Sequence, residues 1–320
     1  MLASLIINRS MFYFGKKRRM KKNKVVLVAA TMSAGKSSII NALVGREILH
    51  SANEATTAKV TRIHIGRFSN HHIVAYKCDG GLLQQINSLS FDLLKQWNCD
   101  ENIAEIDVSY SIAIHNSAAN LNGITIIDTP GANNSVDSTH NDAFIQALKA
   151  YPNSTLLYVL NATQLGTTDD AEILKVIREN HSAKNIVFIL NKVDMLDGEL
   201  GECVKKYVQN ANGYLESLGF SKPIIVPTMA LPALARKKKY SNEVLSRKER
   251  HALTNELERF YDTPQLLSRA ALLPCRVKRN WQRRMHTVAC NKSTKKYKNE
   301  LRYFSDYCGL QVLKTILNNK

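Results

Sequence analysis

The sequence predicts an α/β fold in which a doubly wound sheet carries helices on both faces. Apolar strand-like runs begin near residues 25, 59, 72, 106, 124, 155, 185 and 223. After the midpoint of the chain, these runs alternate with helix-like runs at residues 139–150, 168–181 and 197–218. Such alternation is typical of a sheet wound on both sides. A chain of 320 residues is long enough for one large domain with an insertion, or for two modest domains.

A glycine–lysine–serine loop follows the first strand-like run. Gly35, Lys36 and Ser37 lie between that run and a helix-like segment. Backbone N–H groups at the start of a helix, one lysine and one hydroxyl are the groups that hold a triphosphate and its metal ion. The usual pattern, G-x-x-x-x-G-K-[ST], has glycine where this chain has Ala30, and alanine fits there if the backbone keeps a negative φ. The predicted phosphate-binding residues are Ala34, Gly35, Lys36, Ser37 and Ser38.

Two further segments supply groups expected around Mg²⁺ and the γ-phosphate. Thr57 lies in a polar stretch at residues 51–58, where a loop threonine can complete the Mg²⁺ shell and sense the γ-phosphate. Asp128 ends an apolar run and is followed by Thr-Pro-Gly131. Asp128 would hold Mg²⁺ through water, and the N–H of Gly131 would face the γ-phosphate. A strand followed by a Pro-Gly turn is the structural alternative.

A fourth segment predicts selection of guanine. Asn191, Lys192 and Asp194 follow a buried strand-like run at residues 186–190. The Asp194 carboxylate can accept two hydrogen bonds from the guanine ring N–H and amino group, a donor pair that adenine lacks. Asn191 would brace the base and the neighbouring loop, while the Lys192 stem would cover the ring. Thr228, after the next strand-like run, is a further candidate for contact with guanine O6.

The residues of these loops carry a family resemblance. Ser33 lies in the phosphate loop, and Ser37 is followed by Ser-Ile-Ile-Asn-Ala-Leu-Val-Gly-Arg-Glu. Together with residues 128–131 and 191–194, this pattern resembles the dynamin superfamily, and in particular its bacterial dynamin-like branch, over about residues 25–230.

The resemblance implies a dynamin-type P-loop GTPase domain, or G domain, that binds GTP and GDP with Mg²⁺ and hydrolyses GTP. It implies that Ser33 assists hydrolysis and that Thr57 belongs to the first switch, so Ser33, Lys36 and Thr57 are the predicted catalytic residues. GTP-dependent pairing of G domains stimulates turnover in this family. Ala132 stands where Ras-like enzymes carry the glutamine that orients water, so hydrolysis would rely on Ser33, on backbone groups around the switches, or on a second G domain. The predicted metal ligands are Ser37, Thr57 and Asp128.

These signals divide the chain into four predicted segments. They are a basic N-terminal extension at residues 1–24, a dynamin-type G domain at residues 25–230, a basic helix-prone insertion or reduced stalk base at residues 231–307, and the closing helix of the G domain at residues 308–320. The long stalk that dynamin-like proteins normally carry is not recognisable. We expect it to be absent or supplied by another chain.

The net charge of +17 is unevenly distributed. Residues 1–24 contain eight basic and no acidic side chains, and residues 236–302 contain 19 basic and six acidic ones, so the remainder is slightly acidic. Clusters at residues 16–19 and 236–239 suggest an anionic partner, either phospholipid headgroups or nucleic acid. A solvated charged face is an equally weighted alternative.

The leading functional prediction is a dynamin-like switch that pairs through its G domains, or with a dynamin-like partner chain, at an anionic membrane surface. No apolar stretch reaches the length that spans a bilayer, so the predicted location is cytoplasmic, or peripheral on the inner face of the membrane. One alternative is a GTP-gated nucleic-acid or ribosome-associated factor, with Tyr240, Trp281 and Tyr297 helping to bind bases. Another is a non-hydrolysing partner subunit of a full-length homologue.

Two smaller observations add expectations about residue environments. The six cysteines show no C-x-x-C pair, which indicates reduced cytosolic thiols rather than a zinc site. The adjacent His71 and His72 are expected on a surface turn.

Overall fold

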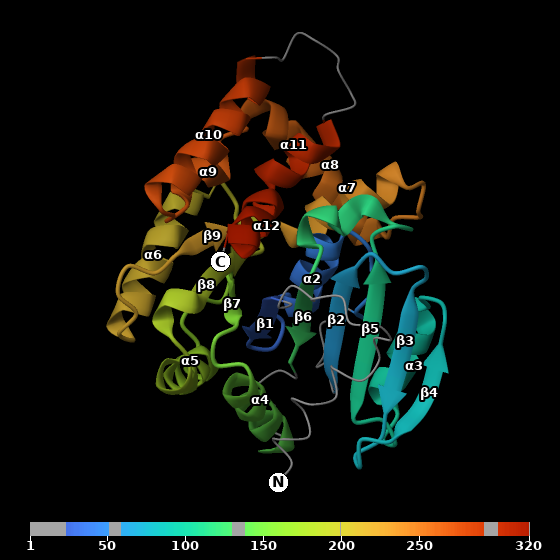
Figure 1. Cartoon of the computed structure of the whole chain (residues 1–320). Helices are drawn as coiled ribbons and strands as arrows, with labels where there is room; N and C mark the ends of the chain where they lie inside the picture. Colours follow the sequence, from blue (N-terminus) through green and yellow to red (C-terminus); the bar gives the residue numbers. More distant parts are fainter. Residues whose placement is uncertain (1–23, 51–58, 130–137, 199, 291–299, 320) are drawn as a thin grey trace.

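A single mixed β-sheet organises the protein. The computed structural model describes residues 24–50, 59–129, 138–198, 200–290 and 300–319. Within these residues, nine strands lie in the order β4-β3-β5-β2-β6-β1-β7-β8-β9 (Figure 1). The strands are β1 (Lys24–Ala30), β2 (Val60–Gly66), β3 (His72–Tyr76), β4 (Leu82–Ile86), β5 (Glu105–Ser111), β6 (Ile124–Asp128), β7 (Thr155–Asn161), β8 (Ile186–Asn191) and β9 (Ile225–Pro227).

The strands from β6 to β9 form a continuous parallel unit. Neighbouring strands in the order β6-β1-β7-β8-β9 all pair in parallel, whereas β2 runs antiparallel to β6. Val28 pairs with Asp128 across β1 and β6, and Asn161 pairs with Asn191 across β7 and β8. The register therefore brings the carboxyl ends of β1, β6 and β8 to one edge, which is where open α/β sheets bind ligands.

The helices alternate with strands in the parallel half and follow one another at the end of the chain. They are α2 (Lys36–Val44), α3 (Phe91–Cys99), α4 (Ser138–Ala150), α5 (Thr168–Asn180), α6 (Val204–Ser217), α7 (Ala230–Tyr240), α8 (Arg247–Asp262), α9 (Leu266–Ala270), α10 (Cys275–Cys290), α11 (Glu300–Tyr307) and α12 (Leu310–Asn319), with short 3₁₀ helices η1 (Asn116–Leu121), η2 (Ala183–Asn185) and η3 (Val193–Met195). The three helix-like runs predicted after the midpoint correspond to α4, α5 and α6. None of the helices in the described ranges is long and apolar enough to cross a bilayer.

Burial of the central strands confirms the predicted α/β fold. All residues of β8 and all but the first residue of β7 are buried, so both faces of these strands are covered. Strands covered on both faces carry nearly continuous apolar residues, as β7 and β8 do. Strand β4 was not predicted, because it is an edge strand whose residues are mostly exposed and show no apolar alternation.

The last helix of the chain packs beside the phosphate-loop helix. Helix α12 contacts α2 and η1, and the turn that precedes it lies against the end of β9. Gly309 in that turn has a φ of 81°, and a Cβ there would lie 2.5 Å from the carbonyl oxygen of Pro227. The backbone N–H of Met229 donates to the carbonyl of Cys308 at 3.1 Å. These contacts fix the start of α12 to the loop that follows β9.

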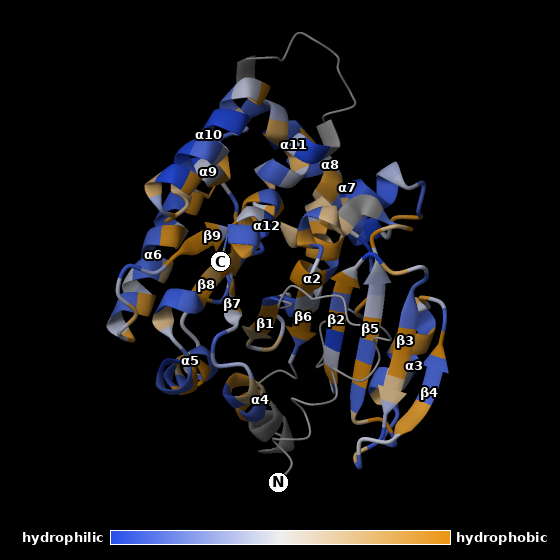
Figure 2. Cartoon of the chain, viewed as in Figure 1, coloured by the Kyte–Doolittle hydropathy of each residue, from blue (hydrophilic) through white to orange (hydrophobic). Residues whose placement is uncertain are grey.

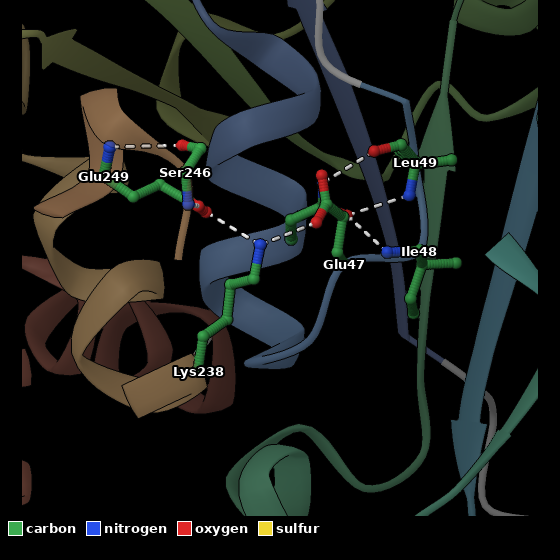
Figure 3. Close-up of polar contacts among 7 residues, drawn as sticks. Glu47, Ile48, Leu49, Lys238, Ser246 and Glu249 are labelled. Atoms are coloured by element: carbon green, nitrogen blue, oxygen red, sulfur yellow. Dashed lines mark hydrogen bonds and ion pairs between the residues drawn. The ribbon is translucent and has the colours of Figure 1, made fainter. Parts of the chain in front are cut away.

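Part of the basic cluster at residues 236–239 is turned into the protein. Lys237 donates to the carbonyl of Ala42 at 3.0 Å, and burial lowers the pKa of Lys237 to about 8. Lys238 lies 2.9 Å from Glu47 and 2.8 Å from Glu249 (Figure 3). These two lysines therefore join α7 to the end of α2 and to the start of α8, and they are not available to an external anion.

The carboxylate that Lys238 contacts on α8 also begins that helix. Glu249 and Ser246 form a capping box, in which each side chain bonds to the backbone N–H of the other (Figure 3). Next to Glu47, the other partner of Lys238, the Asn41 side chain accepts hydrogen bonds from the N–H groups of Ile48 and Leu49 at 2.9 Å each. The segment leaving α2 is thus fixed by side chains from α2 and α7.

Two sequence expectations about aromatic and histidine residues are wrong. Trp281 is fully buried and donates to the carbonyl of Asp306 at 2.8 Å, so it cannot stack on a nucleic-acid base. His71 is also buried; its ring stacks on His115, and its Nδ1 accepts the N–H of Ser111 at 3.1 Å. Tyr240 is exposed, and Tyr297 lies outside the described residues.

Candidate functional site

The loop between β1 and α2 has the backbone of a phosphate-binding loop. Ser33 has a φ of 61° and Gly35 a φ of 93°, so two left-handed residues turn the chain from the strand into the helix. The first N–H groups of a helix have no partner within the helix and attract anions. No side chain caps the start of α2. The N–H groups of its first turn are therefore oriented for an anion at the carboxyl edge of the sheet.

The departure from the usual glycine pattern does not distort this loop. Ala30 is the last residue of β1, is buried, and is not among the described residues with a positive φ. Its backbone is therefore one that any L-residue adopts. The positions that need unusual φ values are Ser33 and Gly35.

Lys36 and Asp128 form a buried ion pair across the carboxyl edge. Lys36 is the first residue of α2, and Asp128 is the last residue of β6. The Nζ of Lys36 donates to Oδ1 of Asp128, and both side chains are almost completely buried. The structure thus brings together two residues 92 positions apart that were predicted to bind phosphate and Mg²⁺.

Asn191 joins the phosphate loop to the loop that follows β9. Its Nδ2 donates to the carbonyl of Ala34 at 3.1 Å. Its Oδ1 accepts the hydroxyl of Thr228 and the N–H of Ala230, each at 3.3 Å. Both ends of one buried side chain are used, so Asn191 fixes the distance between three loops.

The same side chain explains why residue 35 is glycine. A Cβ on Gly35 would lie closer to Nδ2 of Asn191 than real Cβ contacts allow. The φ of 93° would also strain any L-residue. The loop therefore needs glycine here for two independent reasons.

The predicted base-binding residues lie immediately after β8. Lys192 has a φ of 65° and immediately precedes the short helix η3, in which Asp194 is half-buried. Burial raises the pKa of Asp194 to about 6, and the negative charge of Glu256 on α8 adds to this shift. Burial, together with Lys248 of α8, lowers the pKa of Lys192. Helix α8 therefore contributes to the electrostatics of the predicted base-binding loop, which no sequence motif indicated.

A further acidic residue that the sequence analysis missed anchors the phosphate loop. Asp170 at the start of α5 is buried; it accepts the hydroxyl of Tyr158 at 2.7 Å and also bonds to the side chain of Thr31. Burial raises the pKa of Asp170. Thr31 belongs to the phosphate loop, so this loop is tied to α5 on one side and to Asn191 on the other. The only sequence signal for this role was the acidic first turn of a predicted helix.

Of the remaining predicted residues, three serines are described by the structure and two residues are not. Ser37 is buried in the first turn of α2, next to Lys36, and Ser38 follows it half-buried. Ser33 is exposed at the mouth of the loop. Thr57 and Gly131 lie outside the described residues, so their predicted places in the switch loops stay predictions.

The residues present fit a nucleoside triphosphate with Mg²⁺. Gly35 provides a cradle that a Cβ would fill, the start of α2 provides N–H groups, and Lys36 provides a buried cation. The Ser37 hydroxyl and the Asp128 carboxylate are oxygen ligands of the kind that Mg²⁺ prefers. A carboxylate in the base-binding loop matches the paired donors of guanine.

Comparison with protein families decides the assignment. The Dynamin family profile matches residues 26–193, which is just over half of the chain and includes the phosphate loop and the strand before Asn191. The chain belongs to the dynamin family. The matched region is a dynamin-type G domain, and G domains of this family are GTPase domains.

The similar proteins include bacterial members of the family. Dynamin-like protein A from Bacillus subtilis (strain 168) is 28% identical over 167 residues, covering 52% of this chain and 13% of that protein. A chain of an oligomerised bacterial dynamin pair, described as a means of long-range sensing and tethering of membranes, matches 91% of this chain and 43% of its own length at 17% identity, with a TM-score of 0.49. A second such chain matches 78% of this chain and 36% of its own length at 17% identity, with a TM-score of 0.47.

The family profile and the Bacillus relative confirm the predicted resemblance to the bacterial dynamin-like branch. The comparisons also show that the chain spans only about an eighth of the length of the curated relative, and less than half the length of the matching structures. The region that the family profile matches is the G domain, so the activities of the whole relatives belong to the proposals below.

Proposed function

We propose that this protein hydrolyses GTP to GDP and phosphate with Mg²⁺, as a dynamin-like switch that pairs through its G domain at a membrane surface. The observation that carries the hydrolytic part is the convergence of Lys36, Asp128 and Asn191 around Gly35 at one edge of the sheet. These residues come from three sequence segments, around residues 35, 128 and 191, and their contacts are specific to the fold.

Each residue has a role that follows from its position. Lys36 would exchange its contact with Asp128 for the β- and γ-phosphate oxygens of GTP, while Ser37 and Asp128 would hold the metal ion. Mg²⁺, when bound, neutralises charge that develops on the phosphate oxygens during transfer. Asp194 accepts two N–H groups of guanine, and Asn191 holds the base loop against the phosphate loop. Thr57 and Gly131 remain candidates for sensing the γ-phosphate.

Pairing of two G domains is supported by the surface beside the phosphate loop. Met32 is 53% exposed and Ser33 is also exposed, so a second protein surface can reach the rim of the nucleotide site. Ala132 replaces the glutamine that orients water in Ras-like enzymes, so catalysis needs another source of positioning. The partner is either a second copy of this chain or a dynamin-like partner chain.

Membrane association is supported by the basic charge of the segments outside the matched G domain. Residues 236–302 contain 19 basic and six acidic side chains, and 17 of the basic ones remain when Lys237 and Lys238, which bond within the protein, are left out. We therefore place the protein in the cytoplasm, peripherally on the inner face of the membrane. The alternative of a nucleic-acid factor loses one of its supports, because Trp281 is buried. The alternative of a non-hydrolysing subunit also loses a support, because Ala30 leaves the phosphate loop undistorted.

The test of hydrolysis is phosphate release by the purified chain with GTP, with and without Mg²⁺. We expect turnover that needs the metal and that is lost in Lys36→Ala, because the phosphate oxygens then have no buried cation. Lys175→Ala, which removes an exposed lysine of α5, is the matched control and should keep full activity. Turnover that survives in Lys36→Ala would contradict the site.

The test of pairing is the size of the protein in solution with GDP and aluminium fluoride, which imitates the transition state. We expect a dimer in that state and a monomer with GDP alone. A monomer in both states, in a preparation that hydrolyses GTP, would show that a different partner chain is needed.

A further inference from the structure

Helix α10 presents a row of arginines to solvent. Its 16 residues include five lysines and arginines and no aspartate or glutamate. Arg276, Arg279 and Arg283 are exposed, and their spacing of three and four residues places them on one face of the helix. Figure 2 shows the hydrophilic character of this helix at the edge of the molecule, away from the sheet.

The opposite face of α10 fixes the direction of this row. Trp281 and Met285 are fully buried, and the indole N–H of Trp281 donates to the carbonyl of Asp306 at 2.8 Å. Arg284 forms an ion pair with the Asp306 carboxylate at 2.7 Å. The helix is therefore held against α11 by its inner side, and it cannot turn its arginines inward.

Nearby charges extend the positive surface instead of neutralising it. Lys278 donates to the carbonyl of Ala271 at 2.6 Å, and its pKa is lowered by burial and by the positive charge of Lys205 on α6. Arg269 of α9 is exposed beside α10. Among the described residues, no carboxylate forms an ion pair with Arg276, Arg279 or Arg283.

Helix α8 shows that this composition is not a general property of the C-terminal helices. It has the same length of 16 residues, but it carries four basic and four acidic side chains. One of these acids, Glu256, forms an ion pair with Arg259 at 2.7 Å. Like charges at helical spacing destabilise a helix, and α10 keeps them without internal compensation.

We propose that the arginine face of α10 is a docking surface for anionic phospholipid headgroups. This inference deepens the membrane part of the proposed function and rests on it. A guanidinium group binds phosphate and carboxylate oxygens through two parallel N–H bonds, so a row of three suits a plane of headgroups. The apolar side of α10 is occupied by contacts within the protein, so the helix lies on the headgroups and does not insert into the acyl chains.

The same face is less suited to nucleic acid. Proteins that bind single strands stack bases on exposed aromatic side chains, and the one tryptophan of α10 is buried. The charges lie on the outer side of a helix, and they spread towards α6 and α9. Such a broad surface matches a membrane better than it matches the narrow track of a single strand.

The experiment compares vesicle binding of the full chain with that of a triple variant, Arg276→Gln, Arg279→Gln and Arg283→Gln. Glutamine keeps the side-chain length and helix propensity while removing the charge. The vesicles are phosphatidylcholine with phosphatidylserine, or phosphatidylcholine alone, and binding is measured by sedimentation. We expect the wild type to bind the anionic vesicles and the triple variant to bind them roughly 100-fold more weakly, since each basic residue contributes about a fivefold gain at such a surface.

The matched control removes the same charge from other faces. The variant Lys95→Gln, Lys149→Gln and Lys175→Gln changes exposed lysines of α3, α4 and α5, and it should retain vesicle binding. Equal loss in both triple variants would show that net charge acts rather than α10, and it would overturn the proposal.

Two further readouts separate this inference from the hydrolytic function. GTP turnover in solution should be the same in the wild type and in the α10 variant, because α10 contributes no residue to the nucleotide site. Turnover without any binding of the wild type to anionic vesicles would overturn the docking surface and leave the GTPase assignment intact. Binding to duplex or single-stranded RNA that is lost in the α10 variant, and that vesicles do not displace, would also overturn it in favour of nucleic acid.

Discussion

The rim of the nucleotide site, at the carboxyl edge of the sheet, and helix α10 both carry positive side chains. The environments of these side chains are opposite. At the rim, Lys36 is buried and lies against Asp128, so its charge is balanced within the protein. On α10, Arg276, Arg279 and Arg283 are exposed, and no carboxylate of the described residues pairs with them. A buried, balanced charge defines a geometry for one ligand, whereas a row of exposed like charges defines a surface for many similar ligands.

The largest effect is expected from a substitution that disrupts the geometry of the nucleotide site. Gly35→Ala should weaken GTP binding by more than about 100-fold, because a positive φ alone costs an L-residue about 1–2 kcal/mol and the new Cβ also clashes with Asn191. Isothermal titration with GTP measures the change. Vesicle binding through α10 should persist in this variant.

Ala30→Gly is the matched control for that substitution. It restores the usual glycine of the pattern at a position that is buried in β1 and has no positive φ. We expect GTP affinity to stay within about threefold of the wild type, since the backbone there needs no glycine. A large gain in affinity would mean that Ala30 does distort the loop.

A smaller effect tests the base-binding part of the rim. Asp194→Asn should weaken GTP binding by about 10- to 100-fold, which corresponds to loss of a charge-assisted hydrogen bond. Because an amide donates where the carboxylate accepts, the variant should gain affinity for xanthosine triphosphate, whose base carries a carbonyl in place of the amino group. Competition between the two nucleotides measures the exchange, and unchanged selectivity for GTP would remove Asp194 from the site.

The pH dependence of GTP binding should follow the same carboxyl group. The pKa of Asp194 is raised to about 6 by burial and by Glu256, while Arg259 and Lys192 oppose the shift. Only the ionised form accepts both N–H groups of guanine, so affinity should be constant well above pH 6 and fall by about tenfold per unit below it.

A second variant separates this titration from that of the nucleotide phosphates. Glu256→Gln removes the neighbouring negative charge, so it should lower the pKa of Asp194 and move the loss of affinity to lower pH. The phosphates titrate identically in both proteins, so the difference between the two curves reports on Asp194. Coincident curves would exclude Glu256 as a cause.

The smallest expected effect concerns the inner face of α10. Trp281→Phe should lower the free energy of unfolding by about 1 kcal/mol, because the hydrogen bond to the carbonyl of Asp306 is lost. Urea unfolding measures this change, and GTP turnover should stay at the wild-type level. Loss of RNA binding with unchanged stability would instead show that Trp281 contacts bases.

The rim could be predicted largely from sequence because its chemistry depends on short motifs. Gly35 with Lys36, Asp128 at a strand end and Asn191 with Asp194 each carry a local signal, and strand order brings the signals together. Asp170 and Glu256 could not be found in this way. Their roles arise from contacts between segments that are far apart in the chain, and neither belongs to a motif.

The basic residues show the same limit of prediction from sequence. The run at residues 236–239 suggested an external partner, yet Lys237 and Lys238 bond to α2 and α8. The arginines of α10 are more widely spaced in the sequence and form no such run, although helical geometry places them on one face. Adjacent charges in a helix point in different directions, so a run is a weaker signal than a spacing of three or four.

Asn191 has a consequence for the order in which ligand groups are recognised. Its amide donates to the carbonyl of Ala34 and its carbonyl oxygen accepts the hydroxyl of Thr228, so one side chain joins the predicted base-binding part of the site to the predicted phosphate-binding part. A nucleoside without any phosphate, once seated against Asp194, would already stabilise the chain around Gly35. Binding of the base would therefore reduce the cost of ordering the loop that we expect to hold the phosphates.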